Sequence, residues 1–429
     1  MGKFLDLIKS CLGRAAPQAP RPAPRKYKLF TKDFSTNPHS RWAVAMFQAV
    51  TDTANTPDAN FVASPYAAEV ILTALFPDLK GPLHSIIMPP DVFYFDGNCY
   101  PGLDQHAATP DGAMSGGSVA FYDDNCRLEP QPEKAIERAV KAGFIKTTVE
   151  RFLEKTFETT GQFIDGKITL LLTHFKCEAQ LHWVNIVDFT GQWEFPFEKA
   201  DTISGTFYCA NNEEKTVEFM RNENGIIRWL FGSNERREDD PQMILLDIVE
   251  GKFTVMLLLP AKRTDELDSL EKQLTIEKLL EWRRKSAQDL AYIVIPKFRI
   301  SCDVNLQPVR IALGLKRSNE PSTPFCPEIS EEDSRQMCVS QFRQQVTFEL
   351  DEYGINAAPA DYCRKEWGMT MLNEKPDVFV DRPFLMVIWD EMANVPVFMG
   401  RITDPSLSGF PAHSSSSTAA GETEVAADP

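Results

Sequence analysis

The sequence predicts an α+β protein in which helices come first and a large, mostly antiparallel sheet follows. Apolar residues recur at helical spacing near the N-terminus, and from about residue 168 the pattern changes to short runs rich in β-branched and aromatic residues. With 429 residues, 43% of them apolar and 25% charged, the chain is long enough to bury a sizeable core. Helices followed by strands are typical of the α+β class.

Two helices are expected to begin the fold. Residues 40–50 place Trp42, Met46, Ala49 and Val50 at helical spacing. Residues 64–76 predict a second helix, with Ser64 as N-cap and Pro65 at the first helical position. We expect further helices over residues 132–143, 148–160 and 267–285, and a loop over the Pro/Gly-rich residues 77–118.

The predicted strands share β-branched and aromatic composition and are bounded by turn residues. They cover residues 168–172, 181–189, 204–209, 226–231, 243–248, 253–260, 291–300, 345–350, 384–389 and 395–402. We expect these strands to form a large, mostly antiparallel sheet.

Low-complexity segments are expected only at the two ends. Residues 1–27 end in a Pro/Ala/Arg-rich tether, and residues 406–429 are small and polar enough to predict a disordered tail. Residues 28–405 contain no comparable break. We therefore expect one large domain, and a monomer.

The net charge of −16 argues against nucleic acid or an anionic membrane surface as a partner, because both attract clustered Lys and Arg. The nine cysteines are scattered without a CxxC pair, which indicates neither a disulfide framework nor a metal site. Lys and Asp interrupt the first apolar run, so no signal-peptide core forms, and no N-x-S/T acceptor occurs. We expect an intracellular, cytoplasmic protein, with secretion by another route left open.

No catalytic motif is found, and we expect neither an enzyme nor a cofactor. Residues 161–167 come close to a phosphate-binding loop, but Ile168 stands where the magnesium-binding hydroxyl would be. A turn between a helix and a strand explains this stretch. The six histidines include no pair at metal-ligand spacing.

Residues 349–363, ELDEYGINAAPADYC, have two halves of different character. The first half reads as a strand that runs into a glycine turn at Gly354. In the second half, Ala357, Ala358, Pro359 and Ala360 remove almost all side-chain bulk shortly before the last apolar segments.

Several segments, in order along the chain, resemble the serpin family. They are NFVASPY (60–66), VNIVDFTGQWEFPF (184–197), IPKFRIS (295–301), LGL (313–315), FELDEYG (348–354) and DRPFLMVIWDEMANVPVFMGRITDP (381–405). The last is close to the family's C-terminal signature, with Arg382-Pro383-Phe384, Phe398-Met399-Gly400 and Asp404-Pro405 in place. The chain is therefore identified as a diverged member of the serpin family.

The resemblance implies a central sheet of five strands, two further sheets and an exposed reactive-centre loop, here from about Gly354 to Val380. In inhibitory serpins a protease cleaves this loop, which then inserts into the sheet and traps the acyl-enzyme. The implied reactive-centre hinge consists of Glu352, Gly354, Ile355, Asn356, Ala357, Ala358, Pro359 and Asp361.

This hinge departs from the family pattern at four positions. Ile355 stands where Thr or Ser is usual, and Asn356 stands where Glu is usual. Pro359 would remove a ladder hydrogen bond from an inserted strand. Asp361 would carry a carboxylate into the sheet interior, and both residues count against insertion.

The resemblance implies that Glu352 is the family's acidic residue seventeen positions before the cleaved bond. This count places the candidate scissile bond between Gly368 and Met369. Gly is a poor anchor for most protease primary pockets, so Arg364, Lys365 and Trp367 are alternative bond residues. Residues 361–372 would be the surface presented to a serine or cysteine protease, or to another protein partner.

The resemblance also implies a polar cluster that controls opening of the sheet, formed by Ser64, Asn185, Ser340 and Gln344. Ala67 replaces a family Ser nearby, and Gln344 replaces a His. Two functions follow as hypotheses: a serpin-type protease inhibitor, or a non-inhibitory serpin that acts as a binding or scaffold protein.

Overall fold

The computed structural model describes residues 37–53, 59–69, 114–123, 142–147, 181–211, 213–229, 241–262, 266–306, 339–357 and 377–406. These ranges contain two sheets, of nine and seven strands, and a smaller number of helices than strands, so the predicted α+β class is confirmed. The expected N-terminal tether, the expected helix over 148–160 and the expected strand over 168–172 lie outside the described residues. The division of the chain into tether, domain and tail stays a prediction.

The first predicted helix is α2, Pro38–Thr53, which buries Trp42, Met46 and Ala49 as the spacing predicts. The second begins where expected, because residues 65–69 are helical and the Ser64 hydroxyl accepts a hydrogen bond from the Ala67 N–H at 3.2 Å. The segment 267–285 forms two helices, α8 (Leu267–Gln273) and α9 (Ile276–Lys285). Thr275 separates them and caps α9.

The larger sheet has nine strands. Its path is β1 (Phe61–Ala63), β16 (Val395–Ile402), β15 (Phe384–Asp390), β9 (Phe253–Leu259), β8 (Gln242–Asp247), β7 (Glu214–Trp229), β10 (Ala287–Pro296) and β14 (Asp377–Phe379), with β6 (Ile203–Tyr208) beside β7. β7 has 16 residues and pairs with β6 and β10 over most of its length but with β8 at its C-terminal end. The two smaller sheets that were expected are therefore continuous through this one strand.

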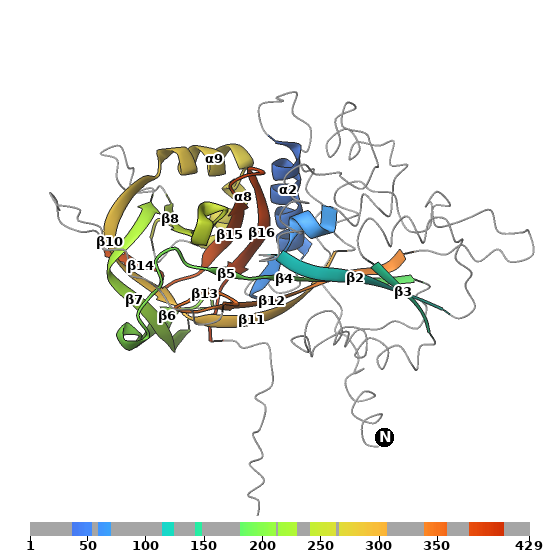
Figure 1. The fold of residues 1–429 in the computed structure, drawn as a ribbon, viewed down its shortest axis with the longest axis horizontal. Helices are drawn as coiled ribbons and strands as arrows, with labels where there is room; N and C mark the ends of the chain where they lie inside the picture. Colours follow the sequence, from blue (N-terminus) through green and yellow to red (C-terminus); the bar gives the residue numbers. More distant parts are fainter. Residues whose placement is uncertain are drawn as a thin grey trace, which may run out of the picture.

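The second sheet has seven strands. Its path is β3 (Ala142–Thr147), β2 (Met114–Asp123), β4 (Leu181–Phe189), β12 (Val339–Leu350), β13 (Gly354–Ile355) and β5 (Gly191–Gln192), with β11 (Phe298–Asn305) beside β12. Five of these strands are long, which matches the expected central sheet, and β13 and β5 have two residues each. Figure 1 shows this sheet running along one side of α2 and the β15–β16 pair.

In the N-terminal half, the predicted ends of one loop and of one helix were wrong. Residues 114–118 were expected in a loop because of their glycines and serines, but they belong to β2 and pair with β4. Residues 142–143 were expected to end a helix but pair with β2 as the start of β3. In both cases the hydrogen bonds of the sheet outweigh weak local preferences, since the ladder uses backbone groups that every residue type supplies.

The two sheets pack through aromatic side chains and through β1. The Phe189 ring of β4 lies 5.3 Å from that of Phe253 in β9 and 5.8 Å from that of Phe398 in β16, both edge-on. The Val62 N–H of β1 reaches the buried Sγ of Cys302 in β11 at 3.3 Å. No helix within the described ranges is both long and apolar enough to cross a membrane.

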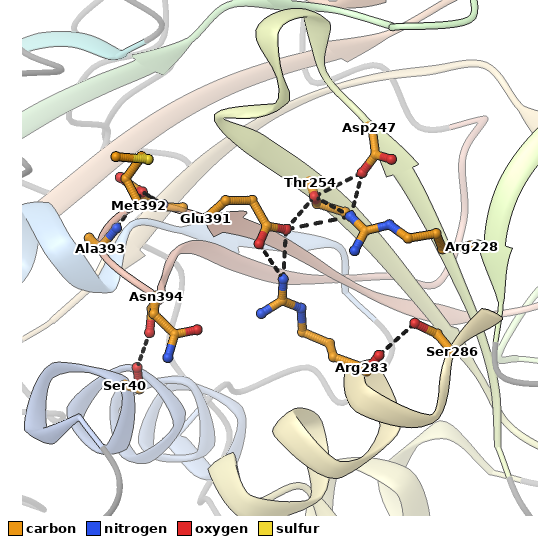
Figure 2. Close-up of polar contacts among 11 residues, drawn as sticks. Ser40, Arg228, Asp247, Thr254, Arg283, Ser286, Glu391, Met392, Ala393 and Asn394 are labelled. Carbon is orange, nitrogen blue, oxygen red and sulfur yellow. Dashed lines mark hydrogen bonds and ion pairs between the residues drawn. The ribbon is translucent and has the colours of Figure 1, made fainter. Parts of the chain in front are cut away.

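A charged network ties α9 to the larger sheet, as Figure 2 shows. The Glu391 carboxylate accepts hydrogen bonds from the Arg283 guanidinium at 2.6 Å, and its Oε1 lies 2.5 Å from the Thr254 hydroxyl. Arg228 bridges the same hydroxyl and Asp247. Burial alone would raise the pKa of Glu391, but Thr254 and Arg283 outweigh burial and hold it below its usual value.

We expect Glu391→Gln to lower stability at pH 7 by about 1–2 kcal/mol, because a partly buried charged hydrogen bond is lost. Since the folded pKa lies below the unfolded one, this stabilisation is present above the unfolded pKa and disappears as the pH falls through the folded pKa. Urea unfolding at pH 7 and at pH 3 measures it. Glu281→Gln, which breaks an exposed pair with Lys285, is the control and should change little. An equal loss at both pH values would contradict this account.

Candidate functional site at a parallel strand junction

The candidate site is the junction between β4 and β12 in the middle of the seven-stranded sheet. These two strands run parallel, from Val339↔Leu181 to Val346↔Val187. Their other neighbours, β2 and β11, are antiparallel to them. A further strand placed between β4 and β12 in the opposite direction would make antiparallel pairs on both sides, and antiparallel pairing is slightly more stable per residue. β4 and β12 are therefore paired directly at a position where the sheet could accommodate one more antiparallel strand.

Gln344 holds this junction together from the buried face. Its Nε2 donates to Asn185 Oδ1 across the junction at 2.9 Å and to the main-chain oxygen of Ser64 at 3.0 Å. Its Oε1 accepts from the Ser64 N–H at 2.6 Å. Gln344 and Ser64 are both 0% exposed and Asn185 is 5% exposed, so these bonds form without competition from water.

Ser64 links the junction to the larger sheet. Its hydroxyl donates to the main-chain oxygen of Val397 in β16 at 2.8 Å and also caps the helix that begins at residue 65. The predicted polar cluster is thus brought together at Ser64, Asn185 and Gln344. Ser340 lies in β12, but its side chain is outside the described part, and the role of the cluster in sheet opening stays a prediction.

The turn after β12 is fastened on several sides. The Asp351 carboxylate accepts from the N–H groups of Tyr353 and Gly354 at 2.8 and 3.2 Å. The indole N–H of Trp193 donates to the main-chain oxygen of Asp351 at 2.9 Å. Gly354 has φ 153°, and a Cβ there would lie 2.0 Å from the Gly191 oxygen, so only glycine fits.

Glu352 is the charged anchor of this turn. Its Oε1 accepts from the Thr202 hydroxyl at 2.6 Å and lies 3.0 Å from Lys297 Nζ. Burial would raise the pKa of this carboxyl, but the hydrogen bonds from Thr202 and Lys297 lower it below its usual value. Lys297 also reaches Glu218 at 3.3 Å, which connects the turn to β7.

The hinge residues that the structure describes are bound into the sheet. Ile355 is 0% exposed and pairs with Leu350 of β12 and Gly191 of β5. Asn356 has φ 47°, a left-handed conformation that Asn tolerates better than most residues. Ala357 is half-buried. The expected loop therefore begins in β13 and ends in β14, which pairs with β10.

The rest of the predicted loop lies outside the described residues. This applies to Ala358, Pro359 and Asp361 of the hinge, and to Arg364, Lys365, Trp367, Gly368 and Met369 near the candidate bond. No group of His, Cys, Asp and Glu suited to a metal ion is found among the residues that are described.

Sequence reasoning missed the partners that hold the turn. Trp193 and Lys297 both stand in segments that carried the family resemblance, so their positions were visible while their contacts were not. Asp188 stands in one of these segments too, but Thr202 had no sequence signal, and each of the two acts through a residue more than 140 positions away.

We expect Gln344→Ala to destabilise the protein by about 2–4 kcal/mol, since it leaves three buried polar groups without this partner. Gln344→His, which retains a hydrogen-bonding side chain, should recover part of the loss. The exposed Gln273→Ala is the control. Chemical denaturation measures all three variants, and a Gln344→Ala variant as stable as the control would refute the structural role.

The comparisons with known proteins all point the same way. The family model described as Serpin (serine protease inhibitor) matches residues 38–405. Serpin B6 of Macaca fascicularis is 29% identical over 298 residues, which cover 68% of this chain and 75% of that protein. Serpin B9 of Homo sapiens is 29% identical over 245 residues, covering 56% and 63%. Alpha-1-antiproteinase F of Cavia porcellus is 24% identical over 379 residues, covering 86% and 90%.

Solved structures show the same fold. Mouse protein-Z dependent protease inhibitor superimposes with a TM-score of 0.71 at 20% identity, covering 89% of this chain and 98% of that one. Human thyroxine-binding globulin, solved in complex with thyroxine, superimposes with a TM-score of 0.70 at 17% identity, covering 88% and 99%. At these identities the likeness concerns the fold alone.

Proposed function

The chain belongs to the serpin family, and on that premise we propose that it inhibits a serine or cysteine protease by inserting the segment after Ile355 between β4 and β12. The family acts on target proteases as an inhibitor and not as a catalyst. The protease would cleave within residues 361–372, and the released strand would fill the parallel junction.

The observation that carries this proposal is a hairpin already started at the junction. Main-chain bonds join Asp351 to Gly354 and Asn356 to Glu349, and Leu350 lies opposite Ile355. Extending this register sets Ala357 opposite Phe348, and residues 359, 361 and 363 opposite Val346, Gln344 and Phe342. All four of these β12 residues are buried, and opposite residues of an antiparallel pair face the same side.

The register predicts that residues 357 and 358 face opposite sides of the sheet, so that only residue 357 faces the buried side. Ala357→Glu would place a carboxylate against the Phe348 side chain, so we expect cleavage by the target protease but no covalent complex. Ala358→Glu would point to the outer face and should preserve complex formation. Incubation with trypsin-like, chymotrypsin-like and cysteine proteases, followed by denaturing gels, measures the outcome.

The wild-type chain is tested first, because its outcome decides whether the protein inhibits any of these proteases. A stable complex with one protease, together with a higher Tm of the cleaved chain, supports inhibition. Cleavage by every protease, with no complex and no gain in Tm, would eliminate it. If both Glu variants behave alike, the proposed register is wrong.

A second candidate function, a non-inhibitory serpin that binds another protein, is favoured by the same register. Asp361 would lie opposite Gln344, on the buried face that Ser64 and Asn185 already fill. An ionised carboxylate there costs several kcal/mol unless it finds donors. Pro359 would also leave one acceptor of β4 without a donor.

We expect replacement of Pro359 and Asp361 together by Ala to increase the gain in Tm after cleavage by several degrees relative to the wild type. Tyr362→Ala, whose side chain would face outward opposite Arg343, is the control and should leave the gain unchanged. Calorimetry of intact and cleaved chains measures it. An unchanged gain in the double variant would show that these two residues do not oppose insertion.

We propose that the protein acts inside the cell as a monomer. The intracellular location is supported by the scattered cysteines, of which Cys209 and Cys302 are free and buried. Burial raises the pKa of the Cys302 thiol to about 12, so this thiol stays protonated at neutral pH.

A further inference from the structure

The Asn356 side chain occupies the place where the β4–β12 ladder ends. The last paired residues of the two strands are Val346 and Val187, and beyond them the strands no longer bond directly. The Asn356 Nδ2 donates to the Thr347 oxygen of β12 at 3.2 Å and to the Phe189 oxygen of β4 at 3.0 Å. One carboxamide thus spans the junction at its open end.

The same side chain bonds to two further groups. Asn356 Oδ1 accepts from the Glu349 N–H at 2.8 Å, and Nδ2 also lies 2.6 Å from Asp188 Oδ1, which is buried. Both ends of the carboxamide are therefore in use.

These side-chain bonds replace main-chain hydrogen bonds that a longer β13 would make with β12. In a regular antiparallel pair, Asn356 and Glu349 would exchange two main-chain bonds, but only the Asn356 N–H to Glu349 oxygen bond at 2.8 Å is made. The second bond is supplied by Asn356 Oδ1 in place of the main-chain oxygen. The next bonded pair would be Ala358 with Thr347, and Nδ2 already takes the Thr347 oxygen.

The backbone of Asn356 explains why the side chain can do this. At φ 47° the main chain turns out of the extended conformation that a strand requires, and the carboxamide is directed back into the junction. A carboxamide has the same C=O and N–H groups as a peptide unit, so it satisfies the ladder without lengthening the strand.

We propose that Asn356 is a stop for strand insertion, a side-chain substitute for the first inserted peptide unit that keeps β13 short and the junction closed. The local role concerns the intact chain only, and its consequence for inhibition rests on the proposed function. For β13 to lengthen, Asn356 must return to an extended backbone and release all its side-chain bonds. This residue therefore slows insertion after the loop is cleaved.

The chain offers a matched control. Asn394, in the turn between β15 and β16, also has a left-handed backbone, at φ 56°. It is exposed and lies next to α2, where its main-chain oxygen accepts from the Ser40 hydroxyl (Figure 2). Asn→Gly retains the left-handed backbone at both positions, because glycine adopts it freely, and removes only the carboxamide.

The first measurement is amide hydrogen exchange on the intact full-length chain. In Asn356→Gly we expect either that the Glu349 amide exchanges roughly tenfold faster, or that the Ala358 amide gains protection as the strand lengthens into the vacated place. Asn394→Gly should change neither amide. Unchanged exchange at both amides in Asn356→Gly would overturn the proposal.

The second measurement is the rate at which the cleaved chain gains thermal stability. We expect this rate to be roughly tenfold higher in Asn356→Gly than in the wild type and in Asn394→Gly. Equal rates overturn the stop while leaving the proposed function in place. If no form gains stability, the inhibitory function fails, and hydrogen exchange on the intact chain still decides whether Asn356 closes the junction.

A second substitution covers the case in which the glycine variant does not fold. Asn356→Asp retains the size and the Oδ1 acceptor but replaces both donors with a carboxylate that faces the Thr347 and Phe189 oxygens. We expect its Tm at pH 7 to lie below that of Asn394→Asp. Equal Tm values for the two Asp variants would refute the proposal.

Discussion

The fold depends on a junction that must remain closed although it suits one more strand. β4 and β12 are the long parallel pair in the middle of the seven-stranded sheet, and their direct contact ends at Val346 and Val187. Neutral carboxamides bridge them, from Gln344 to Asn185 beneath the sheet and from Asn356 at the open end. Because a carboxamide carries no charge, it closes the junction without the desolvation penalty that an ionised pair would incur there.

Gln344 also changes how the junction responds to pH. The serpin pattern places His at this position, and a buried His can change charge between pH 5 and 8. Gln344 does not titrate, so this contact persists across that range. Charged groups also lie near the junction: the buried Asp188 carboxylate accepts from Asn356 Nδ2 at its open end, and Glu352 meets Lys297 and the Thr202 hydroxyl in the turn after β12. The buried contact of Gln344 with Asn185 is thus neutral, whereas the turn is anchored by the charged pair of Glu352 and Lys297.

The fold could be predicted from sequence to the extent that its signals are local. Short runs rich in β-branched and aromatic residues indicated β4, β9, β15 and β16, and Ser64 with Pro65 indicated the start of a helix. The glycine-rich start of β2 could not be recognised, because its ladder with β4 uses backbone groups alone. The family resemblance located Ser64, Asn185 and Gln344. The resemblance marked Asn356 only as a departure from the family pattern. Its structural role could not be predicted, because its bonds to Asp188 and Phe189 connect residues far apart in sequence.

Asn356 and Asp361 affect different stages of the proposed insertion, and this difference determines what each can do to inhibition. Asn356 stabilises the closed sheet, so its loss changes how fast insertion starts. Asp361 would lie opposite Gln344 only in the inserted sheet, so it lowers the stability of the product. In the proposed mechanism, strand insertion competes with hydrolysis of the acyl bond, so the relative rates of the two steps decide whether the protease is trapped. A chain with Asn356 intact can therefore be cleaved as a substrate even where insertion remains favourable, whereas Asp361 matters most for how long a trapped complex lasts.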